Sequence, residues 1–262
     1  GGGGATPPIT LTWSTQNAWI DPDTSSADTF LNLDSFASCV LEFPTTDNFS
    51  YTASNNLTRP TGLAFMLNGL RLTGTGGNTS QTSTITGNEL LFTNNLAGES
   101  PFLELAANSS NASFIIENDL TLYHDLIITG NGSANLTITG EISEYHAPIS
   151  LTKSGLSKLT LTGNATLSGP TTVQAGQLTL ANDAVLTSPV ILGQAGTLSG
   201  SGAVSGNLTG PGQVSPGPSI ATLLVTGNAS PGIVTIETNG NQNDKLDVTG
   251  NLDLSESTLQ LS

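Results

Sequence analysis

Two short segments place histidine beside groups that could do chemistry with it. His124 lies between a tyrosine and Asp125, and His146 follows a tyrosine two residues after Glu144. A histidine near a carboxylate can bind a metal ion, or it can act as a base that the carboxylate orients. Neither segment supplies a clustered ligand set. We therefore interpret both histidines as solvent-facing strand or loop residues.

Motifs of known enzyme classes are missing from the sequence. It contains no Gly-x-Ser-x-Gly elbow, no His-Glu-x-x-His and no P-loop. Loose Gly-x-Gly patterns at 200–202 and 210–212 are not followed by the strand–turn–helix pattern of a nucleotide site. Polysaccharide lyases and hydrolases need clustered acidic or basic groups, and this chain has only five basic residues. We expect no enzyme, no catalytic residues and no cofactor.

Two segments rich in aspartate and amide side chains, 21–23 and 241–247, could hold Ca²⁺ through their oxygen atoms. Ten Asn-x-Ser/Thr sequons also occur, which is only slightly more than this composition gives by chance. We interpret the sequons as asparagine and threonine packed into turns, rather than as glycosylation sites.

Composition excludes several classes of partner. The net charge is −15 and only 10% of the residues are charged, so the chain lacks the basic surface that nucleic acids and anionic membranes require. Cys39 is the single cysteine, which excludes an internal disulfide and favours a buried, inert thiol. No apolar run approaches the roughly 18 residues of a membrane span, so we expect no direct membrane insertion. The first residue is not Met, which fits an exported protein, and we expect an extracellular or bacterial cell-surface location.

Strand patterns cover the chain. Apolar residues alternate with threonine or another polar residue, as in 135–138, 158–161 and 177–180, and glycine, asparagine or proline follows each short run. Strings of the form Leu-x-x-Thr-Gly recur at irregular intervals. Many short strands with one turn glycine each predict an all-β repeat architecture. We favour a parallel β-helix, with a β-sandwich or jelly roll as the alternative.

The first hundred residues hold both tryptophans and most of the phenylalanines. A solenoid must cover its first coil, so these aromatic residues predict an N-terminal cap, with a separate binding module as the alternative. The expected division is a flexible leader at 1–8, a cap region at 9–100 and a β-helix at 101–262 that contains a repeat motif at 151–181.

That repeat motif carries a resemblance to a known family. Ten residues have the spacing of the autotransporter-associated β-strand repeat, also called the passenger-associated transport repeat, of bacterial secreted proteins: Lys153, Gly155, Leu159, Leu161, Gly163, Gly169, Thr171, Val173, Gly176 and Leu178. Residues 210–227 and 243–262 resemble the segments that follow the repeat in that family, while Leu-Ser-Lys at 156–158 departs from its usual Gly-Thr or Gly-Ser pairs.

The resemblance implies a right-handed parallel β-helix outside a bacterial cell, and it makes Asp244 a structural corner residue. Leucine and valine should then form the axial core, while threonine and asparagine line the solvent faces. We expect inward side chains at Leu159, Leu161, Val173, Leu178 and Leu180. Thr160 and Thr162 should face water.

Two functions remain open. The first is a structural stalk or fibre subunit of the cell surface or biofilm matrix, in which a strand carrying Ile9, Leu11 and Trp13 is donated to the open coil edge at 252–262 of another copy and builds a filament. The second is an adhesin. Its aromatic platform would bind a surface glycan or a host protein through Trp13, Trp19, Phe30 and Phe36.

Overall fold

The computed structural model describes residues 9–13, 19–20, 27–28, 38–44, 50–57, 64–74, 81–107, 112–146, 148–181 and 183–262. These residues form β-strands and turns, with no α-helix among them. The strands are β1 Ile9–Thr12, β2 Trp19–Ile20, β3 Ala27–Asp28, β4 Val40–Pro44, β5 Tyr51–Asn55, β6 Phe65–Leu67, β7 Gly69–Thr73, β8 Thr82–Gly87, β9 Leu90–Phe92, β10 Phe102–Leu105, β11 Ser113–Ile116, β12 Leu120–Leu122, β13 Leu126–Thr129, β14 Asn135–Ile138, β15 Ile142–Glu144, β16 Leu151–Lys153, β17 Lys158–Leu161, β18 Ala165–Thr166, β19 Thr171–Leu180, β20 Val185–Leu186, β21 Val190–Gly200, β22 Ala203–Val204, β23 Leu208–Pro216, β24 Thr222–Val225, β25 Ala229–Ile236, β26 Thr238–Asn239, β27 Gln242–Asn243, β28 Lys245–Val248 and β29 Thr258–Leu261.

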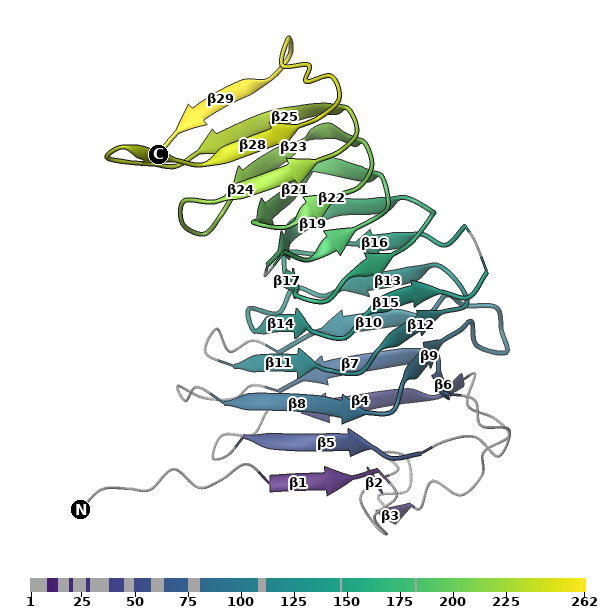
Figure 1. Ribbon diagram of the computed structural model, residues 1–262. Helices are drawn as coiled ribbons and strands as arrows, with labels where there is room; N and C mark the ends of the chain where they lie inside the picture. The colour runs from purple at the N-terminus through teal and green to yellow at the C-terminus, as the bar shows by residue number, and fades with distance from the viewer. Residues whose placement is uncertain are drawn as a thin grey trace, which may run out of the picture.

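The strands form a parallel β-helix with three faces (Figure 1). Face 1 contains β1, β5, β8, β11, β14, β17 and the C-terminal parts of β19, β21, β23 and β25, followed by β29. Face 2 contains β4, β7, β10, β13, β16 and the N-terminal parts of β19, β21, β23 and β25. Face 3 runs from β6 to β28 through β9, β12, β15, β18, β20, β22 and β24.

The chain visits face 2, face 1 and face 3 in turn and then begins the next coil. In the lower coils of Figure 1 the near strands β8 and β11 run to the right and the far strands β7 and β10 return to the left as the chain rises, so the coil is right-handed. The antiparallel pairs β2–β3 and β26–β27 lie outside the two large sheets. The predicted parallel β-helix is therefore confirmed.

Alternation of side chains produces one continuous core. In β14 and β17 every second residue is buried and those between them are not. Equivalent positions then stack from coil to coil: Leu136 pairs with Leu159, Leu159 with Leu178, and Leu178 with Leu198. Burial of each such side chain contributes about 1.5–3 kcal/mol, and the stack forms one hydrophobic cluster whose buried members run from Trp13 to Ala229.

Coil length changes along the axis, as the sequence numbers of register partners on face 2 show. Phe102 pairs with Gly69 in the coil before it and with Ile127 in the coil after it. Thr171 pairs with Val190 in the next coil, so a much shorter length of chain completes that turn. We call the coils before about residue 150 the long coils and those from β19 to β23 the short coils. Toward β29 the coils lengthen again, since Ile233 pairs with Thr258.

The N-terminal strands belong to the same solenoid. β1 pairs in parallel with β5, and Trp13 is only 2% exposed, with its ring centroid 5.1 Å from that of Phe65 and 5.9 Å from that of Phe43. Strands β4 to β9 continue directly into both large sheets, so the expected boundary at residue 100 does not coincide with a break in either sheet. This aromatic cluster closes the first coils, as the sequence predicts.

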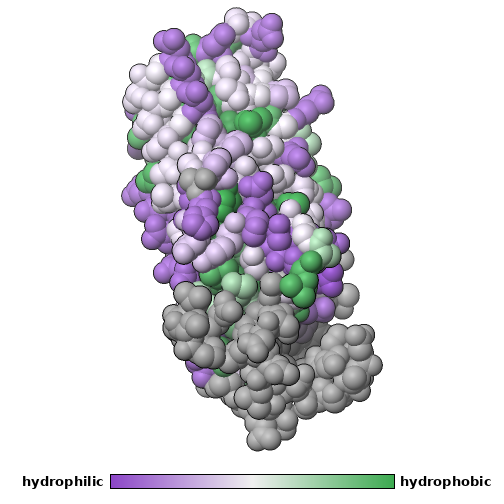
Figure 2. Space-filling model, turned by 90° about the vertical axis from the view of Figure 1, so that its right-hand side faces the viewer, coloured by the Kyte–Doolittle hydropathy of each residue, from purple (hydrophilic) through white to green (hydrophobic). Residues whose placement is uncertain are grey.

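The described residues on one side of the solenoid are mainly hydrophilic (Figure 2). Figure 2 shows one side of the solenoid, where polar side chains surround small, separate hydrophobic patches. None of the described residues forms a helix that could span a lipid bilayer. Near the last coil, Leu259 and Leu261 of β29 are exposed.

Candidate functional site

The repeat motif lies where the long coils become short ones. In one coil, β16 and β17 are separate strands with a turn between them. In the next coil, the single strand β19 pairs with both, through Thr171 to Leu151 and through Leu178 to Leu159. At this corner the first coil of the motif has a turn between two strands, and the next coil, stacked directly on it, passes the corner in a single strand.

Lys153 holds this corner together from the inside. Its side chain is fully buried at the end of β16, and its Nζ donates to the carbonyl oxygens of Ser154 at 3.0 Å, Gly155 at 3.0 Å and Ala175 at 3.3 Å. These carbonyls come from both coils of the junction. Burial lowers the pKa of Lys153 to about 8, because desolvation disfavours the charged amine. The amine thus joins the two coils through backbone oxygens.

Two glycines of the motif adopt a conformation that other residues avoid. Gly155 and Gly176 both have a φ of +72°, in the left-handed region. A Cβ on Gly155 would lie 2.4 Å from the carbonyl oxygen of Gly130, one coil earlier, and a Cβ on Gly176 would lie 2.5 Å from that of Ser157. Glycine is required here because successive backbones approach closely at the corner.

The comparison with family models agrees with this geometry. Residues 151–180 match the passenger-associated transport repeat. The comparisons with curated proteins and with solved structures give no match. The resemblance that the motif suggests is therefore confirmed for this segment, which corresponds to β16 through β19.

The apolar residues of the passenger repeat lie as the alternation predicts. Leu159, Leu161, Val173, Leu178 and Leu180 are buried, and Thr160 and Thr162 are partly exposed. The remaining motif glycines, Gly163 and Gly169, sit where a Cβ would meet the backbone of the preceding coil.

The expectation that threonine lines only the solvent faces is wrong at Thr171. This residue opens β19 with its side chain inside, where its hydroxyl shares a 2.6 Å hydrogen bond with that of Ser188, also buried. Thr171 points inward because it lies two residues before the buried Val173 in the same strand, and side chains two residues apart point to the same face. A hydroxyl is tolerated inside because a second hydroxyl satisfies it.

The same expectation is wrong for three asparagines at corners: Asn55, Asn68 and Asn118 are buried. The amide of Asn68 donates to the carbonyls of Thr93 and Glu99, and that of Asn118 donates to the carbonyl of Asn88. Corner carbonyls have no ladder partner, so a buried amide satisfies them. Strand parity could have identified Asn55, since Tyr51 and Ala53 of the same strand also point inward.

Asp244 has the structural role that the resemblance implies. It is buried, and its two carboxylate oxygens accept hydrogen bonds from the backbone N–H groups of Ala221 and Glu237, both at 2.9 Å. Its carboxylate therefore holds the turn after β25 against the neighbouring coil. Among the described residues, no group of three His, Cys, Asp or Glu side chains could bind a metal ion. The second aspartate-rich segment, 21–23, lies outside the described residues.

The histidines are exposed, as the sequence analysis predicts. The structure brings their neighbours together: Tyr123 and Tyr145 stack with ring centroids 4.2 Å apart and planes inclined by 7°. His146 packs edge-on against Tyr145 at 4.3 Å. The two segments therefore form one cluster on consecutive coils, which sequence spacing alone does not reveal.

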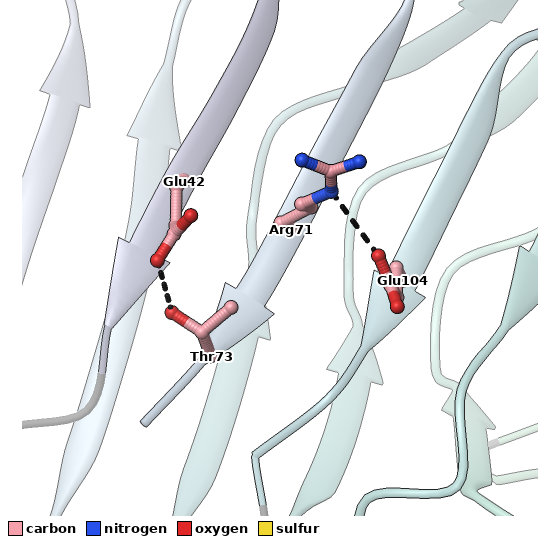
Figure 3. A network of polar contacts seen from close by, with 4 residues as sticks. All are labelled: Glu42, Arg71, Thr73 and Glu104. Atoms are coloured by element: carbon pink, nitrogen blue, oxygen red, sulfur yellow. Dashed lines mark hydrogen bonds and ion pairs between the residues drawn. The ribbon is translucent and has the colours of Figure 1, made fainter. Parts of the chain in front are cut away.

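Face 2 carries a charged ladder across three coils (Figure 3). Arg71 pairs in register with Glu42 and Glu104, and its Nε lies 3.2 Å from Oε2 of Glu104. Thr73 donates a 2.8 Å hydrogen bond to Glu42, and the Arg71 guanidinium lies 5.4 Å from the ring centre of Phe102. Exposed ion pairs of this kind add about 0–1 kcal/mol each, so the ladder contributes little to stability.

The residues proposed for ligand binding and strand donation do not lie together at one exposed site among the described residues. Trp13 is buried and cannot present an exposed ring to a ligand. Trp19 lies in β2, but its side chain, like Phe30 and Phe36, falls outside the described part of the chain. Ile9 and Leu11 lie in β1, which pairs with β5 of its own chain.

The free cysteine has no sign of reactivity. Cys39 precedes β4 and packs against the core. Burial raises the pKa of its thiol to about 12, so it stays protonated at neutral pH.

Proposed function

We propose that this chain is a non-enzymatic structural segment of an exported bacterial protein, in which the solenoid acts as a stalk at the cell surface or in the surrounding matrix. The observation that carries the proposal is the uninterrupted parallel ladder on face 1, which continues from β1 to β29. The passenger repeat inside that ladder supports export, because its family is named for transported passenger segments.

A parallel ladder suits a spacer for a simple geometrical reason. Each added coil extends the molecule by the distance between neighbouring strands, about 4.8 Å, whatever the length of the coil. Loops can therefore vary without changing the length of the stalk. The charge of −15 supports the same role, since an acidic surface keeps such a rod soluble and resists non-specific association.

The proposal does not use strand donation. β1 already forms four register pairs with β5, and Trp13 directly after it lies in the aromatic core. A donated β1 would have to give up both. An adhesive platform on Trp13 meets the same obstacle, because the ring would first have to leave the core.

The test combines location with shape. Intact source cells are treated with an external protease and probed with an antibody against the solenoid, with a cytoplasmic protein as the control. The purified chain is imaged by negative-stain electron microscopy and its mass is measured by light scattering. We expect protease-accessible protein and single rods. A chain found only in the cytoplasmic fraction, or a compact spherical particle, would contradict the proposal.

A further inference from the structure

A pocket of about 230 Å³ lies on the side of the solenoid, at the corner where face 3 turns into face 2. Three consecutive coils supply its walls: Asn94 follows β9, Tyr123, His124 and Asp125 lie between β12 and β13, and His146 follows β15. This corner lies in the long coils, away from the passenger repeat. The stalk function assigns no role to it.

Polar atoms of the pocket have defined hydrogen-bonding states. His124 Nδ1 accepts the backbone N–H of Asn94 at 3.2 Å, so in the neutral ring Nε2 carries the hydrogen and can donate. Asp125 Oδ1 accepts the N–H of Ser150 at 2.7 Å, which leaves Oδ2 as a further acceptor. Oδ1 of Asn94 is buried and has no hydrogen-bond partner, which is an uncommon and costly state.

The aromatic rings give the pocket a firm wall. Tyr123 lines it and is held in place by the parallel stack with Tyr145, and His146 packs edge-on against that second ring. Pro148 and Ile149 complete the lining with apolar surface. The pocket therefore combines ring surfaces with separate donors and acceptors.

We propose that this pocket binds one neutral sugar ring of a glycan. A pyranose offers C–H groups that pack on aromatic surface, and adjacent hydroxyls that each donate and accept hydrogen bonds. His124 Nε2 would donate to one hydroxyl and Asp125 would accept from another. A small rotation of the Asn94 side chain would let its unpaired oxygen accept from a third. The volume suits a single ring at a chain end or branch.

Other ligand classes fit less well. An anionic sugar or phosphate would meet Asp125 and no lysine or arginine among the residues that line the pocket. A metal ion would need three protein ligands, and no such group occurs among the described residues. The inference is independent of the stalk function, because it rests on side chains of a single corner.

The test uses the full chain and saturation-transfer difference NMR with methyl glycosides of glucose, galactose, mannose and N-acetylglucosamine. Asp125→Asn removes the charge but keeps an oxygen for Ser150, and His146→Ala removes an exposed lining ring. Asp183→Asn and Leu156→Ala change exposed residues outside the pocket and serve as matched controls. Melting curves of all four variants verify that each is folded.

We expect at least one glycoside to bind the unaltered chain. Its affinity should fall about tenfold or more in either pocket variant and stay unchanged in both controls. Three results would overturn the proposal: no glycoside binds at tens of millimolar, both pocket variants bind as well as the unaltered chain, or the controls lose binding to the same extent.

Discussion

The long coils and the short coils solve the same packing problem with different side chains. Before residue 150, loops separate the strands of face 2 from those of face 1, and the core holds Phe65, Phe92 and Phe114. From β19 onward, single strands cross that corner, and the fully buried apolar side chains are smaller, chiefly leucine and valine. Protein interiors are close-packed, so the side chains of each region must together fill the core that its strands enclose.

The passenger repeat lies at the junction between the long coils and the short coils. Its first half forms the last coil with a corner loop, and its second half forms the first coil without one. Lys153 contributes to this transition because its amine binds carbonyls from both coils. The comparison leads to four predictions, from the largest expected effect to the smallest.

Inserting residues should distinguish the two regions most strongly. A Gly-Ser insertion between Leu178 and Thr179 interrupts β19 inside face 1, and should prevent cooperative folding because it moves the residues after it out of register with β17 and β21. The same insertion between Leu96 and Ala97, in an exposed turn of a long coil, should cost less than about 1 kcal/mol. Thermal unfolding followed by circular dichroism measures both. Equal effects would show that this strand is no more constrained than the exposed turn.

A charge in the repeat core should have the next largest effect. Leu161→Asp places a carboxylate among stacked leucines, and we expect a loss of several kcal/mol, roughly 3–5, in unfolding free energy. Thr160→Ser, one residue away and partly exposed, is the matched control and should change stability by less than about 0.5 kcal/mol. Urea unfolding gives both values. A neutral Leu161→Asp would mean that the register of β17 is incorrect.

Glycine replacement separates backbone strain from close approach. Gly155→Ala and Gly98→Ala both put a side chain at positive φ, which costs roughly 1–2 kcal/mol. Only Gly155 has backbone of the preceding coil within contact of the new Cβ, whereas nothing lies within 4 Å at Gly98. Gly155→Ala should therefore lower the melting temperature clearly more than Gly98→Ala. Equal decreases would contradict the tight contact between coils at the junction.

The buried lysine should add a distinct pH dependence. The pKa of Lys153 falls to about 8 in the folded chain, while the unfolded chain keeps the ordinary value of 10.5. Between these values the unfolded state binds more protons, so stability should rise with pH, by at most about 1.4 kcal/mol per pH unit. Below pH 8 both states are protonated and this contribution is constant.

Lys153→Met isolates this effect. The difference in unfolding free energy between the original chain and the variant, measured from pH 7 to pH 9, should grow in favour of the original chain above pH 8. Cys39 ionises in the unfolded chain near pH 9 and acts in the opposite direction because its folded pKa is raised, but both chains contain it, so its contribution cancels in the difference. A difference that does not vary with pH would show that the amine is not desolvated.

Much of the fold could be predicted from the sequence because alternation and turn glycines are local signals. They identify the inward leucines of β17 and β19 and the parallel β-helix itself. The burial of Lys153 escaped prediction, although it follows Leu151 by two positions and so shares its inward parity. A lysine is expected to face solvent because its side chain is charged. Only the backbone carbonyls that two coils supply at the corner explain why this amine lies inside.

The pocket lined by His124 and His146 escaped prediction for a different reason. Tyr123 and Tyr145 lie one full coil apart in sequence, and they stack because their strands β12 and β15 are neighbours in register. Coil length sets which residues meet, and it differs widely between the coil that joins Gly69 to Phe102 and the coil that joins Val190 to Leu208. A fixed period read from the sequence cannot supply that pairing.

Distances along face 1 test the central claim most directly. Spin labels at Thr52 and Thr160 are separated by four strand-to-strand steps, and labels at Thr52 and Gln260 by nine. With Cys39→Ser to remove the native thiol, double electron–electron resonance should give about 19 Å for the first pair and about 43 Å for the second, from roughly 4.8 Å per step. Two similar distances would contradict a single stacked solenoid.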